Sequence, residues 1–553
     1  MAWCRALALD LDGTLTQSGP PDDSVVARLA ELRAGGMRLI LVTGRILREL
    51  QTEMPGIVDS FDLVVAENGC LLSSPQRTRR LADPVSPALS TWLSSRQVPV
   101  RRGEVIIATT AAEDHQVLDG VDALHLEVRL VRNRTELMVL PAGVSKGTGL
   151  QAALRDLGVS RHNVVAVGDA ENDLSMLAAA ELSVAVANAV ESVRQDADVV
   201  LLHPDGRGLL DLLGQNVLNR ESPVASDRRQ IVLGDGDDGC AVSIPAQTTV
   251  LIKGNSESGK SFLAGLMAEQ LVALEYSLLI IDPEGDHVCL GSIPGVLVVS
   301  APDLPAPVTL LDLYALGVVA VVLDLSASSV AARERYLDLL WPHVVEHRTL
   351  TSTPHWVVVE EAQNLKVCRQ IVPRWWGGSG VCLVTYRPDL LPPAVVAAMA
   401  WQLEASAEVP ARLEASSGVA REFRPADRWT HHVRHLHKYA DAPLPATSGF
   451  VFTAEGNQVG STVGTLREFV DVLSNLPAAV IVGHAQRGDF SRWLGDQYRD
   501  RVAASLVRAA ERDLLAHGDG DRARRQISDI VGRRYLSGLP PTQPRLTASL
   551  DGH

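Results

Sequence analysis

The chain has 553 residues, of which 46% are hydrophobic, and it carries a formal net charge of −15 at pH 7. One hydrophobic core does not extend over this length, so we expect roughly three or four domains. The acidic balance argues against a surface that binds nucleic acid as a whole, although it leaves a local basic patch open.

Neither a membrane span nor a secretion signal is expected. No apolar run approaches about 18 residues, and the first residues lack a charged leader followed by a long apolar stretch. The six cysteines form no CxxC pair, which is typical of reduced thiols, so we predict a cytoplasmic protein. Only five of the 51 basic residues are lysines, and two of these, Lys146 and Lys260, fall inside the phosphate motifs described below.

The first motif is the hexad Asp-Leu-Asp-Gly-Thr-Leu at residues 10–15, directly behind the apolar run 6–9. Side chains alternate along a strand, so Asp10 and Asp12 project to the same side while Leu11 turns into the core. Two such acids suit a nucleophile paired with a proton donor, with Mg²⁺ bridging them to a phosphate. A strand that merely ends in acidic residues is the alternative at this point.

Three further polar motifs accompany strand-like or helix-like runs. Thr43 closes the apolar run 37–42, and Lys146 precedes a helix-like stretch. Asp169 follows another apolar run and Asp173 lies four residues later, a spacing that predicts both acids on one face at the start of a helix. A hydroxyl and an ammonium are suited to the oxygens of a phosphoryl group.

The order Asp-x-Asp, Thr, Lys and Gly-Asp-x-x-Asn-Asp resembles the haloacid dehalogenase (HAD) superfamily of phosphatases, in particular its Cof-type, subclass IIB-like branch. The resemblance spans roughly residues 5–213. It implies a doubly wound α/β core over 1–83 and 141–213, with a small α+β cap inserted at 84–140. Its accessory motifs are Glu67-Asn68-Gly69, Gly143-Val144-Ser145-Lys146-Gly147 and Ala187-Asn188-Ala189.

The resemblance also implies a role for each motif residue. Asp10 would attack phosphorus and carry an aspartyl-phosphate, and Asp12 would protonate the leaving oxygen and then activate water. Thr43 and Lys146 would hold the phosphoryl oxygens. The implied Mg²⁺ ligands are the Asp10 carboxylate, the Asp12 carbonyl, Asp169 and Asp173. The expected activity is therefore that of a phosphoric monoester hydrolase acting on a small phosphorylated metabolite.

The predicted cap is rich in arginine. We expect these side chains at the solvated surface, with contact to a second anionic group of the substrate as the alternative. The residues are Arg101, Arg102, Arg129, Arg132 and Arg134.

A second phosphate motif follows a polar, weakly periodic stretch at 214–229, which is typical of a linker. After the strand-like run 249–252, the chain reads as a full Walker A loop: Gly254, Asn255, Ser256, Glu257, Ser258, Gly259, Lys260 and Ser261. Its backbone amides are expected to cradle phosphates, Lys260 to reach the β and γ groups and Ser261 to bind Mg²⁺. We predict an ATP-binding P-loop NTPase domain over 230–445.

The acidic partner of this loop is unusual. The apolar run 356–359 ends in Glu360 and Glu361, where an Asp is usual at the first position. We expect Glu360 on the Mg²⁺ side and Glu361 in the water-activating role. Together with the strings 278–286 and 384–388, the pattern resembles the HerA/FtsK branch of P-loop ATPases, whose hexameric rings move DNA or protein.

Three readings of the second domain stay open. A phosphatase joined to a P-loop domain also resembles polynucleotide kinase–phosphatases, which process nucleic-acid ends. A HerA/FtsK-like motor with an accessory phosphatase would assemble as a homo-oligomer and engage nucleic acid. In the third reading the domain only binds nucleotide and gates the phosphatase.

The remaining sequence predicts a helical carboxyl-terminal domain over 446–540, including helices near 465–473 and 499–515, followed by a flexible Pro-rich tail at 541–553. The expected class is thus α/β in both large modules, with a helical end.

Overall fold

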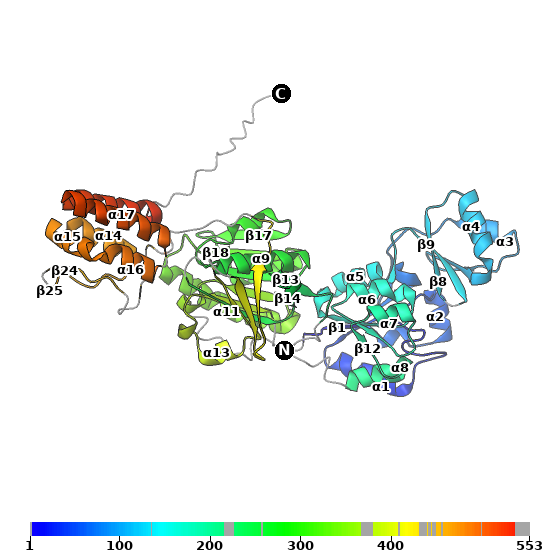
Figure 1. Cartoon of the computed structure of the whole chain (residues 1–553). Helices are drawn as coiled ribbons and strands as arrows, with labels where there is room; N and C mark the ends of the chain where they lie inside the picture. Colours follow the sequence, from blue (N-terminus) through cyan, green and yellow to red (C-terminus); the bar gives the residue numbers. More distant parts are fainter. Residues whose placement is uncertain are drawn as a thin grey trace, which may run out of the picture.

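The computed structural model describes residues 3–133, 135–214, 226–255, 258–365, 380–406, 410–430, 440, 444, 449–454, 457–498 and 500–536. Figure 1 shows a capped amino-terminal core at one end, a bundle of carboxyl-terminal helices at the other and a large mixed sheet between them. Within the described residues, the helices are too short or too polar to span a lipid bilayer.

The amino-terminal core is built on an eight-stranded sheet with the order β12-β11-β10-β1-β2-β3-β4-β5. Its parallel strands are β1 (Ala6–Leu9), β2 (Arg38–Val42), β3 (Leu63–Ala66), β10 (Val164–Gly168), β11 (Leu182–Ala185) and β12 (Val199–Val200). β4 (Leu71–Ser73) and β5 (Thr78–Arg80) extend one edge in antiparallel fashion. The central strands are almost wholly apolar because helices cover both faces of a parallel sheet.

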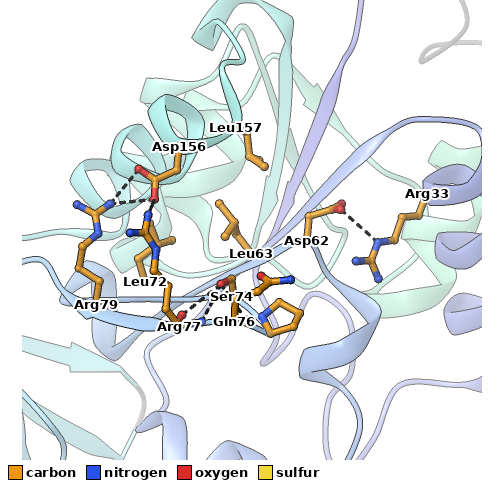
Figure 2. A pocket seen from close by; sticks show the side chains of 11 residues that line it. Arg33, Asp62, Leu63, Leu72, Ser74, Gln76, Arg77, Arg79, Asp156 and Leu157 are labelled. Carbon is orange, nitrogen blue, oxygen red and sulfur yellow. Dashed lines mark hydrogen bonds and ion pairs between the residues drawn. The ribbon is translucent and has the colours of Figure 1, made fainter.

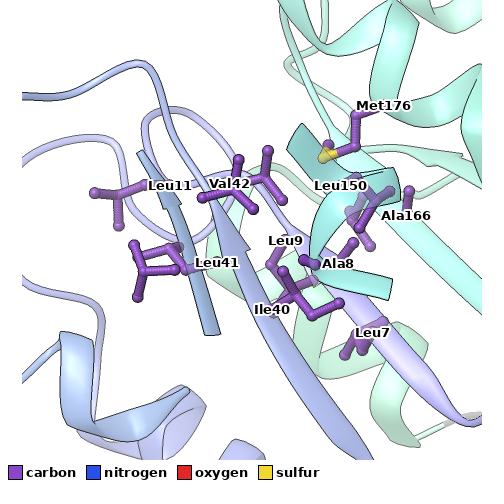
Figure 3. Close-up of a cluster of buried hydrophobic side chains, with 14 of the residues drawn as sticks. Leu7, Ala8, Leu9, Leu11, Ile40, Leu41, Val42, Leu150, Ala166 and Met176 are labelled. Atoms are coloured by element: carbon purple, nitrogen blue, oxygen red, sulfur yellow. The ribbon is translucent and has the colours of Figure 1, made fainter. Parts of the chain in front are cut away.

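Six helices cover this sheet: α1 (Asp23–Ala34), α2 (Leu47–Glu53), α5 (Lys146–Leu157), α6 (Leu174–Ala179), α7 (Glu191–Asp196) and α8 (Asp205–Gly214). Figure 3 shows part of the resulting core, where side chains of β1, β2 and β10 meet those of α5 and α6. Leu9, Ile40, Leu150, Ala166 and Met176 are all fully buried there. The carboxyl ends of β1, β2 and β10, which precede the predicted motifs, are therefore held side by side.

A small α+β unit is inserted into this core. Its antiparallel sheet has the order β6-β7-β9-β8, and α3 (Pro87–Ser94) and α4 (Asp114–Ala123) pack on it with a separate apolar cluster. The strands are β6 (Arg101–Arg102), β7 (Ile107–Thr110), β8 (Val128–Asn133) and β9 (Glu136–Pro141). The predicted α/β core with an inserted α+β cap is confirmed as a fold class, while the residue boundaries between the domains stay a prediction.

The second sheet has eleven strands in the order β14-β13-β23-β22-β21-β15-β20-β19-β16-β18-β17. Its parallel part comprises β15 (Thr249–Lys253), β16 (Leu278–Asp282), β17 (Val296–Ser300), β18 (Ala320–Asp324), β19 (Trp356–Val359), β20 (Val381–Thr385) and β21 (Trp401–Glu404). Antiparallel strands β13 (Gln230–Gly236), β14 (Ala241–Pro245), β22 (Ala411–Ala415) and β23 (Ala420–Pro425) extend one side. Among the described residues of this part, the α-helices are α9 (Lys260–Ala273), α10 (Pro307–Ala315), α11 (Val330–Thr351) and α13 (Pro393–Ala397).

The carboxyl-terminal region is helical, as predicted. It contains α14 (Leu466–Asn475), α15 (Ala478–Arg487), α16 (Asp489–Gln497), α17 (Arg501–His517) and α18 (Gly520–Val531), with a short hairpin of β24 (Thr453–Ala454) and β25 (Asn457–Gln458). Phe469, Phe490 and Ile527 lie in its core. Most of the predicted linker, 215–225, and the predicted tail at 541–553 lie outside the described residues.

The two sheets meet through a buried polar junction at the amino-terminal ends of their strands. His162, just before β10, stacks on Tyr276, just before β16, with ring centroids 3.7 Å apart. His162 Nδ1 lies 2.7 Å from Glu181, and the Tyr276 hydroxyl donates to the same carboxylate at 2.7 Å. Because the parallel strands run away from this junction, the carboxyl ends of the two sheets lie on its opposite sides.

Candidate active sites

The chain turns sharply after β1, and this turn presents the first two predicted acids. Asp10 is 3% exposed, whereas the side chain of Asp12 is 31% exposed. Leu11, between them, is fully buried. Both acids line one cavity, as the strand alternation predicts.

Lys146 is the first residue of α5 and lies among carboxylates. Its Nζ donates to Asp10 Oδ1 and to Asp173 Oδ1, both at 2.6 Å, and the side chain is 2% exposed. Two glycines let the start of α5 pack closely against its neighbours. A Cβ at Gly147 would lie 2.3 Å from a backbone oxygen of α6. A Cβ at Gly149 would lie 2.6 Å from a backbone carbon of the segment after β3. The Gly-rich start of α5 therefore sets the position of the ammonium.

Asp10, Asp169 and Asp173 offer oxygens that all lie within 4.8 Å of one another, and all three residues are buried. Asp173 ends the short 3-10 turn Glu171–Asp173, and its Oδ2 accepts hydrogen bonds from the amides of Asp169 and Ala170, both at 3.0 Å. Asp169 and Asp173 are thus brought together by this turn and not by one face of a helix, since α6 begins only at Leu174. The sequence predicted that the two acids lie close together, and they do, but the predicted helix start is a 3-10 turn.

The charges of this cluster fit a divalent cation. Three carboxylates and one ammonium give the cluster a formal net charge of −2 when all four groups are ionised. Burial and the charge of Asp173 raise the pKa of Asp10 well above its ordinary value. Burial disfavours the Lys146 ammonium, but Asp10 and Asp173 outweigh this effect and raise the pKa of Lys146. An oxygen-only donor set with excess negative charge suits Mg²⁺, so these residues fit the implied ion.

Thr43 follows β2 and is fully buried, with its Oγ1 accepting a hydrogen bond from the Arg45 amide at 3.2 Å. Arg45 contacts both oxygens of Asp12, through Nε at 2.9 Å and Nη2 at 2.6 Å, and its Nη1 contacts Glu53 at 2.6 Å. The hydrogen bond to Asp12 raises the pKa of Arg45. No role was predicted for Arg45 from the sequence, although its place two residues after Thr43 was a usable signal.

A cavity of about 300 Å³ lies between the core and the cap. Asp10, Asp12, Arg45 and Lys146 line its core side. The cap contributes Arg101, Ile106, Ala108, Asn133, Thr135, Glu136 and Met138. Asp10, Asp12 and Lys146 therefore face a cavity whose other wall is the inserted unit.

The predicted cap arginines differ in their position relative to this cavity. Arg101 lines the cavity, where it donates to Glu49 at 2.7 Å and pairs with Glu136. Arg129 donates to a backbone carbonyl, and Arg132 pairs with Asp114. Arg134 lies outside the described residues. Among the predicted cap arginines that are described, Arg101 is thus the one at the cavity.

Glu67 fastens the cap to the core. It is fully buried just after β3, with a left-handed φ of 54°. Its carboxylate accepts hydrogen bonds from three successive amides of the cap, Glu104 at 2.9 Å, Val105 at 2.9 Å and Ile106 at 3.1 Å. This buried contact fixes the loop that forms one wall of the cavity.

A second cavity, of about 360 Å³, lies at the outer edge of the core sheet. Figure 2 shows Asp156 between Arg77 and Arg79, and Arg33 directed toward Asp62. These three ion pairs compensate the arginines locally, and the lining residues include none from the predicted motifs. We assign no activity to this cavity.

The second predicted site begins at the end of β15. Gly254 and Asn255 follow this strand, Ser258 is buried, and Gly259 has a left-handed φ of 96° before α9. Lys260 is the first residue of α9, and its Nζ donates to the Asn255 carbonyl at 2.8 Å. Ser256 and Glu257 lie outside the described residues. The described part has the strand, turn and helix order that a P-loop requires.

Two acids meet the hydroxyl of Ser261, the second residue of α9. Ser261 Oγ donates to Asp286 Oδ2 at 2.9 Å and lies 3.5 Å from Glu360 Oε2. The other oxygen of Glu360 lies 2.7 Å from His287 Nε2. Burial opposes protonation of His287, but the hydrogen bond and charge of Glu360 outweigh it and raise the pKa of His287. The sequence reasoning placed Ser261 and Glu360 here but gave no role to Asp286 or His287.

Glu361 lies directly after Glu360 in a left-handed conformation with φ of 49°. Its Oε2 accepts a hydrogen bond from Gln363 Nε2 at 2.5 Å. Gln363 Oε1 in turn accepts from the Thr385 hydroxyl at 2.6 Å, at the end of β20. The water-activating candidate is therefore connected by side chains to the neighbouring strand. Carboxylates, a hydroxyl and a helix amino terminus together fit Mg²⁺ and nucleotide phosphates.

Comparison with known proteins defines the class of both parts. Residues 7–88 and 105–213 match the haloacid dehalogenase-like hydrolase family, and residues 247–367 match the central domain of helicase HerA. Through its amino-terminal part the chain belongs to the haloacid dehalogenase-like hydrolases, with a HerA-type P-loop domain as its second part. The predicted phosphatase fused to an ATPase-type domain is thereby confirmed.

The similar proteins include two named phosphoglycolate phosphatases. The one from Methanothermobacter thermautotrophicus is 31% identical over 215 residues, which cover 37% of this chain and 96% of that protein. The one from Pyrobaculum islandicum is 33% identical over 218 residues, which cover 37% of this chain and 92% of that protein. A solved haloacid dehalogenase-like hydrolase from Bacteroides thetaiotaomicron is 21% identical with a TM-score of 0.34, over 38% of this chain and 98% of that one.

Proposed function

We propose that the amino-terminal part hydrolyses a small phosphomonoester with Asp10 as the nucleophile. The observation that carries this proposal is the convergence of Asp10, Lys146, Asp169 and Asp173 beside a cavity that the cap lines on its other side. Asp169, Asp173, the Asp10 carboxylate and the Asp12 carbonyl are the proposed Mg²⁺ ligands. When bound, the ion offsets the negative charges of the phosphate and of Asp10.

The residues support a two-step reaction. A carboxylate oxygen of Asp10 attacks phosphorus, the ester P–O bond breaks, and the leaving oxygen takes a proton from Asp12. A water then attacks the phosphorus of the aspartyl-phosphate and gives its proton to Asp12, so that Asp10 and inorganic phosphate are released. Lys146 and Thr43 hold the phosphoryl oxygens. Since Arg45 contacts both oxygens of Asp12, proton donation requires that one of these hydrogen bonds be released when substrate enters.

The cavity supports a small substrate with a second anionic group. Its volume of about 300 Å³ is at the lower end of the range for ligand sites. Arg101 lines the cap side of this cavity, where it pairs with Glu49 and Glu136, so a substrate carboxylate or second phosphate binds it by displacing one of these glutamates. The two relatives named phosphoglycolate phosphatases act on a compound of this kind. We propose phosphoglycolate and similar short phosphorylated acids as the first substrates to assay, with sugar phosphates as the comparison set.

We also propose that the second part binds Mg²⁺ and ATP, with Lys260 on the phosphates and Glu361 orienting the hydrolytic water. The described loop, the first turn of α9 and the two glutamates support this proposal. The HerA match favours an ATPase over a polynucleotide kinase. A ring-forming motor on nucleic acid and a nucleotide-gated phosphatase stay alternatives. Sedimentation with ATP and DNA, and phosphatase assays with and without ATP, distinguish them.

The nucleophile is tested by phosphate release from p-nitrophenyl phosphate, phosphoglycolate and a sugar-phosphate panel. We expect Asp10→Asn to lower the rate by more than about 10³-fold, because no covalent intermediate forms. Asp119→Asn, on the exposed side of cap helix α4, is the matched control and is expected to leave the rate unchanged. Equal rates for wild type and Asp10→Asn would contradict the assignment.

A further inference from the structure

Besides Glu360, which stands at the position of the usual acidic partner of a P-loop (the Walker B acid), a second carboxylate reaches the hydroxyl of Ser261. That carboxylate belongs to Asp286, on the loop after β16, whereas the strand β19 ends in the longer Glu360. Asp286 is 3% exposed and Ser261 is 8% exposed, so both lie in the interior of the site. The loop that carries Asp286 reaches this place because β16 is the direct neighbour of β19.

The loop after β16 is held in shape by Asp282. Oδ1 of Asp282 accepts hydrogen bonds from the amides of Glu284, Gly285 and Asp286 at 3.2, 2.8 and 3.2 Å. Its Oδ2 accepts from the His287 amide at 2.8 Å. Four backbone donors on one buried carboxylate fix the course of the chain from 283 to 287. Asp282 thus stabilises the conformation of the loop, and in this conformation the side chain of Asp286 contacts Ser261.

The hydroxyl of Ser261 is closer to Asp286 than to Glu360. Ser261 Oγ donates a hydrogen bond to Asp286 Oδ2 at 2.9 Å. This ordinary hydrogen-bond length is also about the separation of adjacent oxygens in an octahedral Mg²⁺ site with ligands at about 2.0–2.1 Å, so the pair can hold the ion with little rearrangement. Glu360 Oε2 is farther from the hydroxyl, at 3.5 Å, and the other oxygen of Glu360 already contacts His287.

We propose that Asp286 is the carboxylate that holds the nucleotide-associated Mg²⁺ together with Ser261, and that Glu360 acts as a positioning residue outside the ion's direct ligands. The metal-binding role of a Walker B acid is thereby transferred from β19 to the loop after β16. This inference rests on the proposed binding of Mg²⁺ and ATP to the second part of the chain.

The test measures the affinity of the full-length chain for a fluorescent ATP analogue, with excess Mg²⁺ and with EDTA. In wild type we expect Mg²⁺ to tighten binding. In D286N we expect this tightening to fall by at least about tenfold while the affinity in EDTA is retained, because an amide oxygen can still accept the hydrogen bond of Ser261 while the charge that holds the ion is lost. E360Q is expected to keep most of the Mg²⁺ effect. D303N, on an exposed loop, is the matched control and is expected to bind as wild type does.

A second variant tests the same contact by a gain of binding, which a misfolded protein would not show. D286C places a thiolate at the same position, and thiolates prefer softer ions than Mg²⁺. We expect Cd²⁺ to tighten nucleotide binding to D286C and not to D286N. Full Mg²⁺ tightening in D286N, or no Cd²⁺ effect in D286C, overturns the inference. Failure of wild type to bind the analogue in either condition instead overturns the proposed nucleotide binding itself.

Discussion

The candidate phosphatase site and the P-loop site each contain a lysine at the start of a helix, and the two lysines contact different groups. Lys146 and Lys260 are each the first residue of a helix that follows a strand, but α5 follows β9 of the antiparallel cap sheet, whereas α9 follows β15 of the large, mostly parallel sheet. Lys146 is directed at the carboxylates of Asp10 and Asp173, whereas Lys260 donates to a carbonyl of its own loop. A lysine at a helix start is thus directed at acids in one part and at its own loop backbone in the other, and we propose phosphoryl transfer for the first and nucleotide binding for the second.

The difference comes from what precedes each helix in space. In the amino-terminal core, strands β1 and β10 end in acids, so the lysine offsets charges that the protein itself supplies. In the second sheet, β15 is followed by a glycine-rich loop, and Lys260 contacts the backbone of that loop, which we propose as the cradle of nucleotide phosphates. A cation at a helix start acquires its chemistry from the neighbouring strand ends.

The largest effect is expected from Lys146→Met, which keeps the side-chain volume and removes the ammonium, and so tests whether this charge takes part in the reaction. We expect phosphatase kcat to fall by about 10²–10³-fold, since a preorganised cation at the phosphoryl oxygens is lost. In EDTA the same change leaves buried carboxylates unpaired and is expected to lower the free energy of unfolding by about 3–5 kcal/mol. Phosphate release and thermal unfolding measure the two effects. An unchanged kcat would show that Lys146 has no part in the reaction.

The corresponding change in the P-loop site is Lys260→Ala. We expect nucleotide affinity to fall by about 10²-fold or more, because the charge-assisted contacts to the phosphates are lost. Basal phosphatase activity is expected to stay at the wild-type level, since the two sites lie on opposite sides of the junction. Nucleotide titration and phosphate release on the same preparation measure both. A parallel loss of phosphatase activity would favour the nucleotide-gated reading.

A smaller effect sharpens the account of substrate choice. We expect Arg101→Gln to lower kcat/KM for phosphoglycolate by about tenfold, because a charged hydrogen bond to the second anion is lost, while p-nitrophenyl phosphate is little affected. Arg132→Gln, which alters an exposed cap arginine paired with Asp114, is the control. Equal losses on both substrates would assign Arg101 to the shape of the cap rather than to specificity.

The smallest expected effect concerns the junction between the two sheets. His355 lies 3.3 Å from Asn163 through Nε2, while Nδ1 accepts from the Ser277 amide at 2.8 Å, so the ring is held neutral. Burial, followed by the charges of His162 and Arg348, lowers the pKa of His355 well below its ordinary value of 6.5. The unfolded ring takes up a proton near 6.5 and the folded ring does not. Stability is therefore complete above this pH and is lost as the pH falls below it.

The measurement is thermal unfolding between pH 7.5 and 5.5. We expect His355→Gln to flatten the acid side of the stability profile, because the group that resists protonation is removed. His115→Gln, on the exposed side of α4, is expected to keep the wild-type slope. The same slope in His355→Gln and in wild type would assign the acid sensitivity to other groups.

Local patterns in the sequence predicted the acids at the end of β1, the order of the four phosphatase motifs and the glycine-rich loop before α9. Each of these depends on strand alternation or on a short run of backbone, which neighbouring residues determine. The helical end near 466–475 was predicted for the same reason. The division into a phosphatase and a P-loop domain needed no tertiary information.

Other features depend on strand order, which no local pattern contains. β1 lies between β10 and β2, and this places Lys146 and Asp173 beside Asp10. β16 lies beside β19, and this brings Asp286 to Ser261 although no spacing in the chain links them. The contact of Arg45 with Asp12 arises in the same way. Sequence fixes what a strand end carries, whereas the packing of the sheet decides which strand ends meet, because contacts across a sheet join residues far apart in the chain.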